Sequence, residues 1–127
     1  GLDQAAEIVT GAPEGFSVLS GDDNLTVPLL SVGADGIVFF SKHNTAYEIH
    51  EMVYAFTAGD PKKAAEIHRR LLPVFKSVFI TTNPIPVKAA LSLVGIDAGP
   101  VRPPLVDITE AEMAKVRSAF ESAGLGK

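Results

Sequence analysis

The chain has 127 residues, of which 46% are hydrophobic and 20% charged, the make-up of an ordinary globular protein with one modest core. Its formal charge of -4 and the lack of any run of Lys or Arg argue against nucleic acid as a partner. It has no cysteine, which excludes thiol chemistry, and no apolar run approaches the ~18 residues that a membrane span needs. We therefore expect a soluble, cytoplasmic protein without a membrane partner.

Two short apolar runs predict strands in the first part of the chain. A helical pattern comes first, over residues 3–10, with Asp3 as its expected cap. Residues 16–20 then form a largely apolar run between turn-forming residues, and residues 36–40 form a second. Runs of this kind are typical of buried parallel strands, which are covered on both faces.

A helix is predicted between these two strands, capped by Asp22 or Asp23 and running to about Val32. Two parallel strands joined by a helix form a right-handed crossover unit. Two strands alone leave unpaired edges and an apolar face, so the unit requires more strands. The natural completion is a (β/α)8 barrel, which typically has ~250 residues.

Only helical patterns follow. The Thr-x-x-Glu spacing of a capping box predicts helices that start at Thr45 and at Thr109. Asp60-Pro61 is typical of a cap and a first turn, and the extended connector at residues 83–86 leads into a helix near Val87. The helix after Pro61 is expected to bury six apolar residues: Ala64, Ile67, Leu71, Val74, Phe75 and Phe79.

Four segments resemble the dihydrodipicolinate synthase family. They are GFSVLSGDD at 15–23, GADGIV at 33–38, TNPIPVKAAL at 82–91 and GPVRPPL at 99–105, and the resemblance extends over nearly the whole chain. Gly-Asp-Asp alone is a common turn and cap, whereas its combination with Asn-Pro-Ile-Pro-Val-Lys is specific. The resemblance implies the fold class: the C-terminal part of a (β/α)8 TIM barrel, with its seventh and eighth strands, followed by an all-helical C-terminal domain. We place the barrel part at residues 1–58 and the helical domain at 59–127.

The same resemblance implies a chemistry. Enzymes of this family are class I aldolases in which a lysine forms a Schiff base with pyruvate, and the resulting enamine attacks L-aspartate 4-semialdehyde on the diaminopimelate route to lysine. They need no cofactor or metal and usually form homotetramers. The matching lysine, tyrosines and arginine would lie upstream of Gly1, so we expect no catalytic residue in this chain. Its expected partners are the missing N-terminal half and further copies of the enzyme.

Two residues of the chain match positions that line the family's substrate site. Gly21 matches a glycine beside the bound pyruvate, and Val38 matches a residue whose main-chain carbonyl faces the substrate. The chain departs from the family at residues 39–46, where His43 stands at the position of an asparagine. A divergent pocket, an altered segment and an uncertain reading of the sequence all remain open as explanations.

Other polar residues near this segment invite rival interpretations. Lys42 follows the wrong strand for the Schiff base, and loop lysines are mostly solvated. His43, His50 and Glu51 lack the spacing of a helical zinc face, so we expect no metal site.

Three further features have plain structural interpretations. Tyr47 and Tyr54 are expected to be packing residues. Lys88 opens a helix and is expected to be structural, and the basic cluster at residues 68–70 is expected to be a solvated helix face.

Two alternative functions stay open. One is another pyruvate aldolase of the same superfamily, such as an N-acetylneuraminate lyase or a keto-deoxy-gluconate aldolase. Asp23 argues against the first of these, because sialic acid lyases tend to carry Gly-x-Asp-Glu at this place. The other is an inactive scaffold fragment whose open strand edges pair with a second copy.

Overall fold

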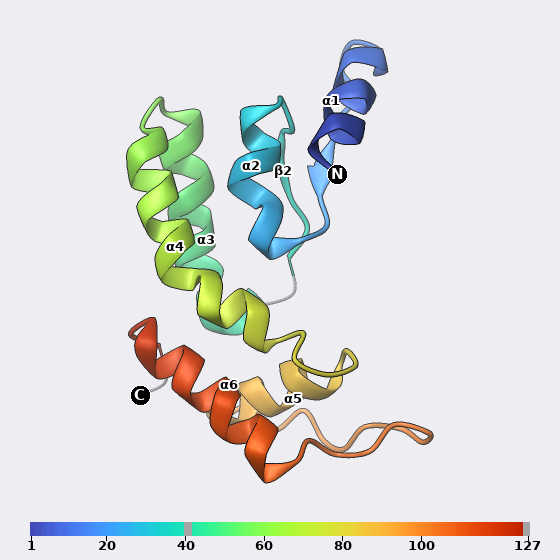
Figure 1. The fold of residues 1–127 in the computed structure, drawn as a ribbon, viewed down its shortest axis with the longest axis vertical. Coiled ribbons are helices and arrows are strands. Elements are labelled where there is room, and N and C mark those ends of the chain that lie inside the picture. The colour runs from blue at the N-terminus through green and yellow to red at the C-terminus, as the bar shows by residue number, and fades with distance from the viewer. Residues whose placement is uncertain (40–41, 126–127) are drawn as a thin grey trace. The chain divides into compact units, whose positions relative to one another are not determined.

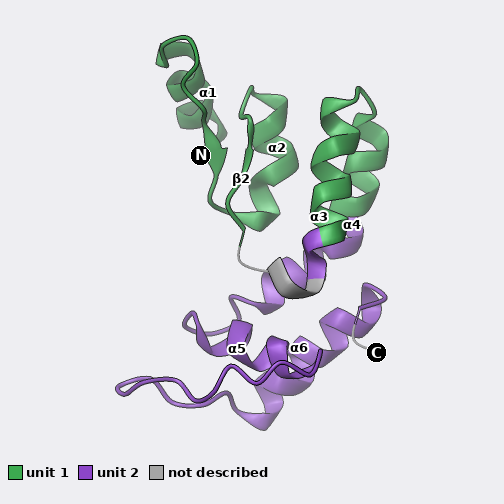
Figure 2. Cartoon of the chain, turned by 180° about the vertical axis from the view of Figure 1, so that it is seen from behind, with its two compact units in different colours: residues 1–39, 47–68 green, residues 40–46, 69–127 purple. Residues whose placement is uncertain are grey.

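The computed structural model describes residues 1–39 and 42–125, and the side chains of residues 42–44 are not described. The chain divides into two compact units (Figure 2). Unit 1 comprises Gly1–Phe39 and Tyr47–His68, and unit 2 comprises Phe40–Ala46 and Arg69–Lys127. The expected domain division between residues 58 and 59 stays a prediction.

Helix α1 (Leu2–Gly11) opens unit 1 (Figure 1). Its N-cap is Gly1 and no side chain caps it, so the prediction that Asp3 is the cap was wrong. Asp3 lies inside the first turn, where a carboxylate is favourable because the exposed amide groups give this end of the helix a partial positive charge. None of the residues of α1 is fully buried.

Strands β1 (Leu19–Ser20) and β2 (Gly36–Ile37) form a parallel pair in which Leu19 lies opposite Gly36. Both are shorter than the predicted runs. A strand extends only where a neighbour offers backbone partners, and in the described part of the chain each of these strands has one neighbour. The Phe16 amide instead donates to the Pro13 carbonyl in a turn at 3.0 Å. Phe40, the predicted end of the second strand, lies outside the described residues.

Asp35 fixes the register of the two strands. Its amide donates to the Val18 carbonyl at 2.8 Å, and its carboxylate Oδ2 accepts the Val18 amide at 2.8 Å. One residue thus satisfies both backbone groups of Val18 just before the ladder begins.

The connection between the strands is a 3-10 turn, η1 (Asp23–Leu25), followed by α2 (Thr26–Ser31). A single helix capped by Asp22 or Asp23 was predicted, but Asp22 makes no side-chain cap bond and Asp23 lies inside the turn. Pro28 explains the break, because it lacks an amide hydrogen and its ring clashes with the carbonyl four residues earlier. The α-helix therefore begins at Thr26, which leaves Pro28 in its first turn.

Helices α3 (Lys42–Thr57) and α4 (Pro61–Ser77) follow, and each contributes residues to both units. In unit 1 they are joined by an ion pair of 2.8 Å between Lys63 Nζ and Glu51 Oε1, which raises the pKa of Lys63 through its hydrogen bond and charge. Because α3 begins at Lys42, Thr45 lies inside the helix, fully buried, and is not the predicted cap. The buried apolar residues of these helices in unit 1 are Ile49, Met52, Ala55, Ala64 and Ile67.

Asp60 caps α4 as predicted, since its Oδ1 accepts the Lys63 amide at 3.0 Å. In unit 2 the later part of α4 buries Leu71, Val74 and Phe75. The helix ends at Ser77, so Phe79 lies beyond it with 45% of its surface exposed, and its predicted place on the buried face was wrong.

Helices α5 (Ile85–Ser92) and α6 (Glu110–Ser122) pack together in unit 2. Helix α5 starts before the predicted Val87, because Pro86 is tolerated in a first turn, where its missing amide hydrogen has no partner to lose. The capping box at the start of α6 is confirmed: Thr109 and Glu112 exchange side-chain and backbone hydrogen bonds. Within the described ranges, no helix has the length and apolar character needed to cross a bilayer.

Candidate functional site

Gly21 and Val38 lie next to each other at the carboxyl end of the two strands. Gly21 follows the last residue of β1, and Val38 follows the last residue of β2. The Val38 amide donates to the Ser20 carbonyl at 2.8 Å, which extends the parallel ladder by one bond. This is the end of a parallel sheet at which barrel enzymes carry their active sites.

The ladder stops at this point because Asp22 turns away from it. In a continuing parallel ladder the Asp22 amide would donate to the Val38 carbonyl. It donates instead to Ser20 Oγ at 3.2 Å, and Ser20 Oγ donates to the Asp22 carbonyl at 2.9 Å. The carbonyl of Val38 is thus left without its ladder partner, at the carboxyl end of the strands, as an acceptor for another donor.

Gly21 is not required by the fold of the described chain. Its φ lies outside the left-handed region, and a Cβ placed on it would meet no atom within 4 Å. Gly33 is different, because its φ is +102° and a Cβ there would come within 2.9 Å of Val9 Cγ1. If a side chain is excluded at Gly21, the cause lies in what occupies the space in front of it.

The side chains around this end are apolar and exposed on one face. Leu19 and Val38 are 51% and 63% exposed, whereas Ser20, which points to the opposite face of the strand, is 1% exposed. No Lys, Arg, His or Tyr occurs before Lys42 in the sequence. These strand ends can therefore position a substrate through backbone groups, but they supply no amine nucleophile.

The structure describes some of the other polar residues near the strand ends but not all of them. The side chains of Lys42 and His43 are not among the described ones. Tyr47 and Tyr54 are 77% and 66% exposed, so their expected packing role was wrong, and Tyr54 stacks on His50 with ring centroids 6.4 Å apart. Among the residues that the structure describes, no three His, Asp or Glu side chains gather as metal ligands would.

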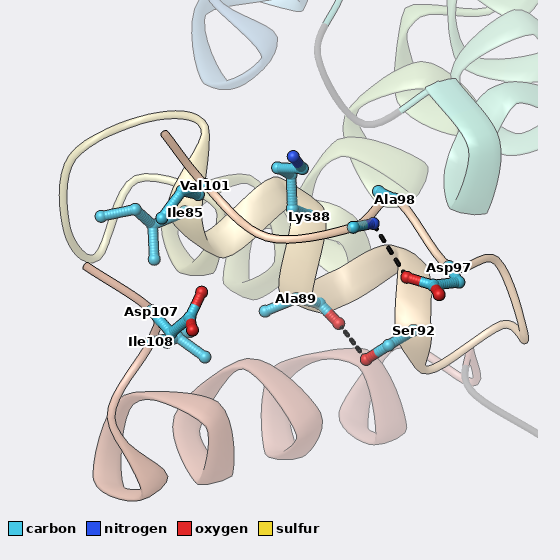
Figure 3. Close-up of a pocket in the computed structure, with 10 residues that line it drawn as sticks. Ile85, Lys88, Ala89, Ser92, Asp97, Ala98, Val101, Asp107 and Ile108 are labelled. Atoms are coloured by element: carbon cyan, nitrogen blue, oxygen red, sulfur yellow. Dashed lines mark hydrogen bonds between the residues drawn. The ribbon is translucent and has the colours of Figure 1, made fainter. Parts of the chain in front are cut away.

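Unit 2 contains a cavity that no sequence pattern indicated (Figure 3). The cavity has a volume of about 210 Å³ and lies between α5 and the irregular segment that follows it. Lys88, expected to be structural, contributes to its wall and donates from Nζ to the Pro100 carbonyl at 2.6 Å. The cavity exists because the irregular segment after α5 folds back over that helix. Hydrophobic periodicity predicts helices and strands but not the path of an irregular segment.

Comparison with known proteins places the chain in a family. A sequence model of the dihydrodipicolinate synthetase family matches residues 1–123. The chain is 51% identical over 124 residues to the 4-hydroxy-tetrahydrodipicolinate synthase of Moorella thermoacetica, and 52% identical over 122 residues to that of Symbiobacterium thermophilum. These matches cover 98% and 96% of the chain but only 42% of each relative.

Solved structures agree with this result. The chain matches the crystal structure of DHDPS from Cyanidioschyzon merolae with lysine bound, with 42% identity and a TM-score of 0.94, over 98% of this chain and 42% of that one. It matches dihydrodipicolinate synthase from Aquifex aeolicus with 38% identity and a TM-score of 0.93, over 99% and 43%. The expected fold class, the last two strands of a (β/α)8 barrel followed by helices, is thereby confirmed. The chain spans about two fifths of the length of these relatives and belongs to the dihydrodipicolinate synthetase family.

Proposed function

We propose that this chain forms the C-terminal part of a 4-hydroxy-tetrahydrodipicolinate synthase. The complete enzyme would condense pyruvate with L-aspartate 4-semialdehyde on the diaminopimelate route to lysine. The names of the relatives of about 50% identity support this assignment over an N-acetylneuraminate lyase or a keto-deoxy-gluconate aldolase.

The proposed reaction needs an amine that the strand ends do not carry. A lysine amine would attack the pyruvate ketone and release water to form an imine, which acts as an electron sink and makes a methyl proton removable. The resulting enamine carbon would then form a bond to the aldehyde carbon of the second substrate. Because no lysine precedes Lys42, we place the Schiff-base lysine outside this chain and expect the chain alone to be inactive.

The observation that carries the proposal is the unforced glycine at the end of β1. Neither backbone conformation nor packing in the described chain requires Gly21, yet it stands where a barrel enzyme holds its substrate. A bound keto acid directly in front of it is a sufficient reason to exclude a side chain. The Val38 carbonyl beside it offers an acceptor to the same ligand.

Borohydride trapping tests the proposed chemistry. The complete polypeptide and the 127-residue chain would each be treated with pyruvate and sodium borohydride, and the mass of each product measured. We expect a reduced pyruvate adduct on the complete polypeptide, at a lysine outside this chain, and none on the chain alone. An adduct at Lys42 or Lys88 would overturn the proposal.

Substitution of Gly21 tests the site itself. In the complete enzyme, Gly21→Ala should lower kcat/KM for pyruvate by about tenfold or more, equivalent to a loss of about 1.4 kcal/mol of transition-state stabilisation. The midpoint of thermal unfolding of the 127-residue chain should not change, because the added methyl group meets no atom of the described chain. Val38→Ala is the matched control and should change kcat/KM less than about twofold, because the proposed contact is made by the main chain. If Gly21→Ala and Val38→Ala lower kcat/KM equally, the proposed substrate site at Gly21 is wrong.

Further parts of the proposal concern the whole enzyme. We place it in the cytoplasm, with residues 1–58 as the end of the barrel, residues 59–127 as the helical domain, and a homotetramer as the assembled form. The alternative function is an inactive scaffold that consists of this chain alone. The intact mass of the protein isolated from its natural source distinguishes the two: a mass of 13.4 kDa supports the scaffold. A natural protein of more than twice that mass supports the enzyme, because the chain spans only 42% of the length of its relatives.

A further inference from the structure

Residues 95–108 form a long irregular segment in unit 2, between the end of α5 and the cap of α6. None of them is buried. Pro100, Pro103 and Pro104 also lack the amide hydrogens with which a segment could pair to a neighbour. Apolar burial therefore holds this segment in place only weakly, and individual hydrogen bonds matter more.

Three hydrogen bonds attach the first half of the segment to α5. At its start, the Gly95 amide donates to the Ser92 carbonyl at 3.2 Å and the Ile96 amide donates to the Leu91 carbonyl at 3.0 Å. Further along, Lys88 Nζ donates to the Pro100 carbonyl at 2.6 Å, a bond that the positive charge of the donor strengthens. The bond from the Gly99 amide to Asp97 Oδ1 at 2.8 Å is internal and attaches nothing to the helix.

The segment is the outer wall of the cavity described above. Ile85 and Ala89 line the cavity from α5, and Val101 and Ile108 line it from the segment (Figure 3). Lys88 also lines it, so the bond to Pro100 bridges the two walls directly. If that bond is lost, the segment stays attached near Ile96 and at the α6 cap, and its middle is free to move outward.

We propose that residues 95–108 are a strap that closes over this cavity, and that Lys88 is the residue that holds the strap closed. Gly95 and Gly99, with φ of +79° and +68°, provide flexible positions on either side of the first turn of the strap. Ala89 and Val101 in the cavity wall are already partly exposed, and opening exposes more of the apolar floor to solvent and to small molecules. This device is independent of the proposed aldolase activity.

A single engineered thiol can report the opening, because the chain has no cysteine. Ala89→Cys places the thiol in the cavity, and Ala90→Cys places it in the core on the same helix, where Ala90 is 2% exposed. The rate of labelling by a neutral alkylating reagent would be measured for each thiol in three backgrounds: the parent chain, Lys88→Met and Lys88→Arg. A fourth background, Lys62→Met on the exposed start of α4, removes the same charge elsewhere.

Lys88→Met should accelerate labelling at position 89 by about threefold to tenfold and leave position 90 unchanged. Loss of a nearby positive charge disfavours the thiolate and so slows labelling, which means that faster labelling must come from access. Lys88→Arg keeps a donor and should label as slowly as the parent, and so should Lys62→Met. Equal acceleration at positions 89 and 90 would mean that Lys88 supports the whole unit, and no acceleration at 89 would mean that the bond does not hold the strap. Either outcome overturns the proposal.

Discussion

At Gly33 a hydrogen atom in place of a side chain lets α1 and the turn after α2 approach closely. Two separate reasons require glycine at position 33. Its φ is +102°, which L side chains rarely adopt, and a Cβ added there would lie only 2.9 Å from Val9 Cγ1. Gly15 has a similar φ of +81° but open space around it. The two glycines therefore separate the conformational requirement from the steric one.

Gly33→Ala should destabilise unit 1 more than Gly15→Ala does. The left-handed conformation alone costs an alanine about 1–2 kcal/mol, which is the loss expected at Gly15. Gly33→Ala adds the contact with Val9, so its unfolding free energy should fall further, and Val9→Ala in the double mutant should restore part of the difference. Urea denaturation of Gly15→Ala, Gly33→Ala, Val9→Ala and the Gly33→Ala/Val9→Ala double mutant measures these changes in unfolding free energy. If the effects of Gly33→Ala and Val9→Ala are additive, the contact between the two positions is refuted.

At the scale of elements, the capping box of Thr109 and Glu112 stabilises the start of α6 through local hydrogen bonds. The Glu112 carboxylate accepts hydrogen bonds from the Thr109 amide at 3.0 Å and from its hydroxyl at 2.8 Å, and these bonds lower the pKa of Glu112 below its ordinary value of 4.5. The charged form is thus favoured in the folded state. Its contribution to stability is present above the ordinary carboxyl pKa and is lost as the pH falls through the lowered one.

The stability difference between the parent and Glu112→Gln should therefore depend on pH. It should be constant near neutral pH and shrink as the pH falls below 4.5, where the carboxylate becomes protonated in the unfolded and then in the folded chain. Thr109→Ala should cost about 1 kcal/mol at neutral pH, because an amide of the first turn loses its acceptor. Chemical denaturation at a series of acidic pH values tests both predictions. A stability difference between the parent chain and Glu112→Gln that grows as the pH falls would contradict the lowered pKa of Glu112.

A second prediction at this scale concerns the end of α4. Phe75 is 2% exposed within the helix, whereas Phe79 lies beyond its end and is 45% exposed. Phe75→Ala should cost about 3–5 kcal/mol, because it leaves a cavity in the core of unit 2. Phe79→Ala should cost less than about 1 kcal/mol. Equal losses in thermal or chemical unfolding would show that Phe79 is covered in solution.

The sequence predicted most elements but not their limits, and the two capping-box spacings show why. Thr109-x-x-Glu112 marks a true helix start, because α6 follows an irregular segment and its cap depends only on neighbouring residues. Thr45-x-x-Glu48 has the same spacing, yet α3 begins earlier and Thr45 is buried inside it. A local signal is overridden where tertiary packing determines which residues enter the helix.

The choice of Gly21 and Val38 as site residues depended on the family resemblance, and their role stays a prediction. Their proximity follows from the order of elements, because parallel strands end at the same edge. The turn of the Asp22 amide towards Ser20 Oγ, which frees the Val38 carbonyl from the ladder, depends on side-chain geometry that no pattern encodes. The same holds for the cavity beside Lys88.

At the scale of the whole chain, β1 and the residues next to the two strands in unit 1 expose large apolar side chains. Leu19 in β1, Phe16 before it and Val38 directly after β2 are all more than half exposed. Exposed apolar residues on strands with open edges favour pairing with other chains.

The isolated 127-residue chain should therefore self-associate at micromolar concentration. Light scattering after size-exclusion chromatography should give a mass above 13.4 kDa, and Leu19→Lys should lower it towards that value, because a charge on a strand blocks edge pairing. Tyr47→Lys, which also replaces an exposed apolar residue but on a helix, is the control and should leave the mass unchanged. A monomeric parent chain would disprove the prediction.

The register that Asp35 sets between β1 and β2 has a practical consequence. Because Asp35 satisfies both backbone groups of Val18, the alignment of these two strands is fixed within the chain and needs no further strand to define it. If the proposed function holds, a separately expressed N-terminal part of the proposed enzyme would meet a template whose strand ends are already in place. The proposed enzyme would then be suited to complementation in trans, in which two polypeptides produced apart regain activity only when they associate, and the recovered rate reports how tightly they bind.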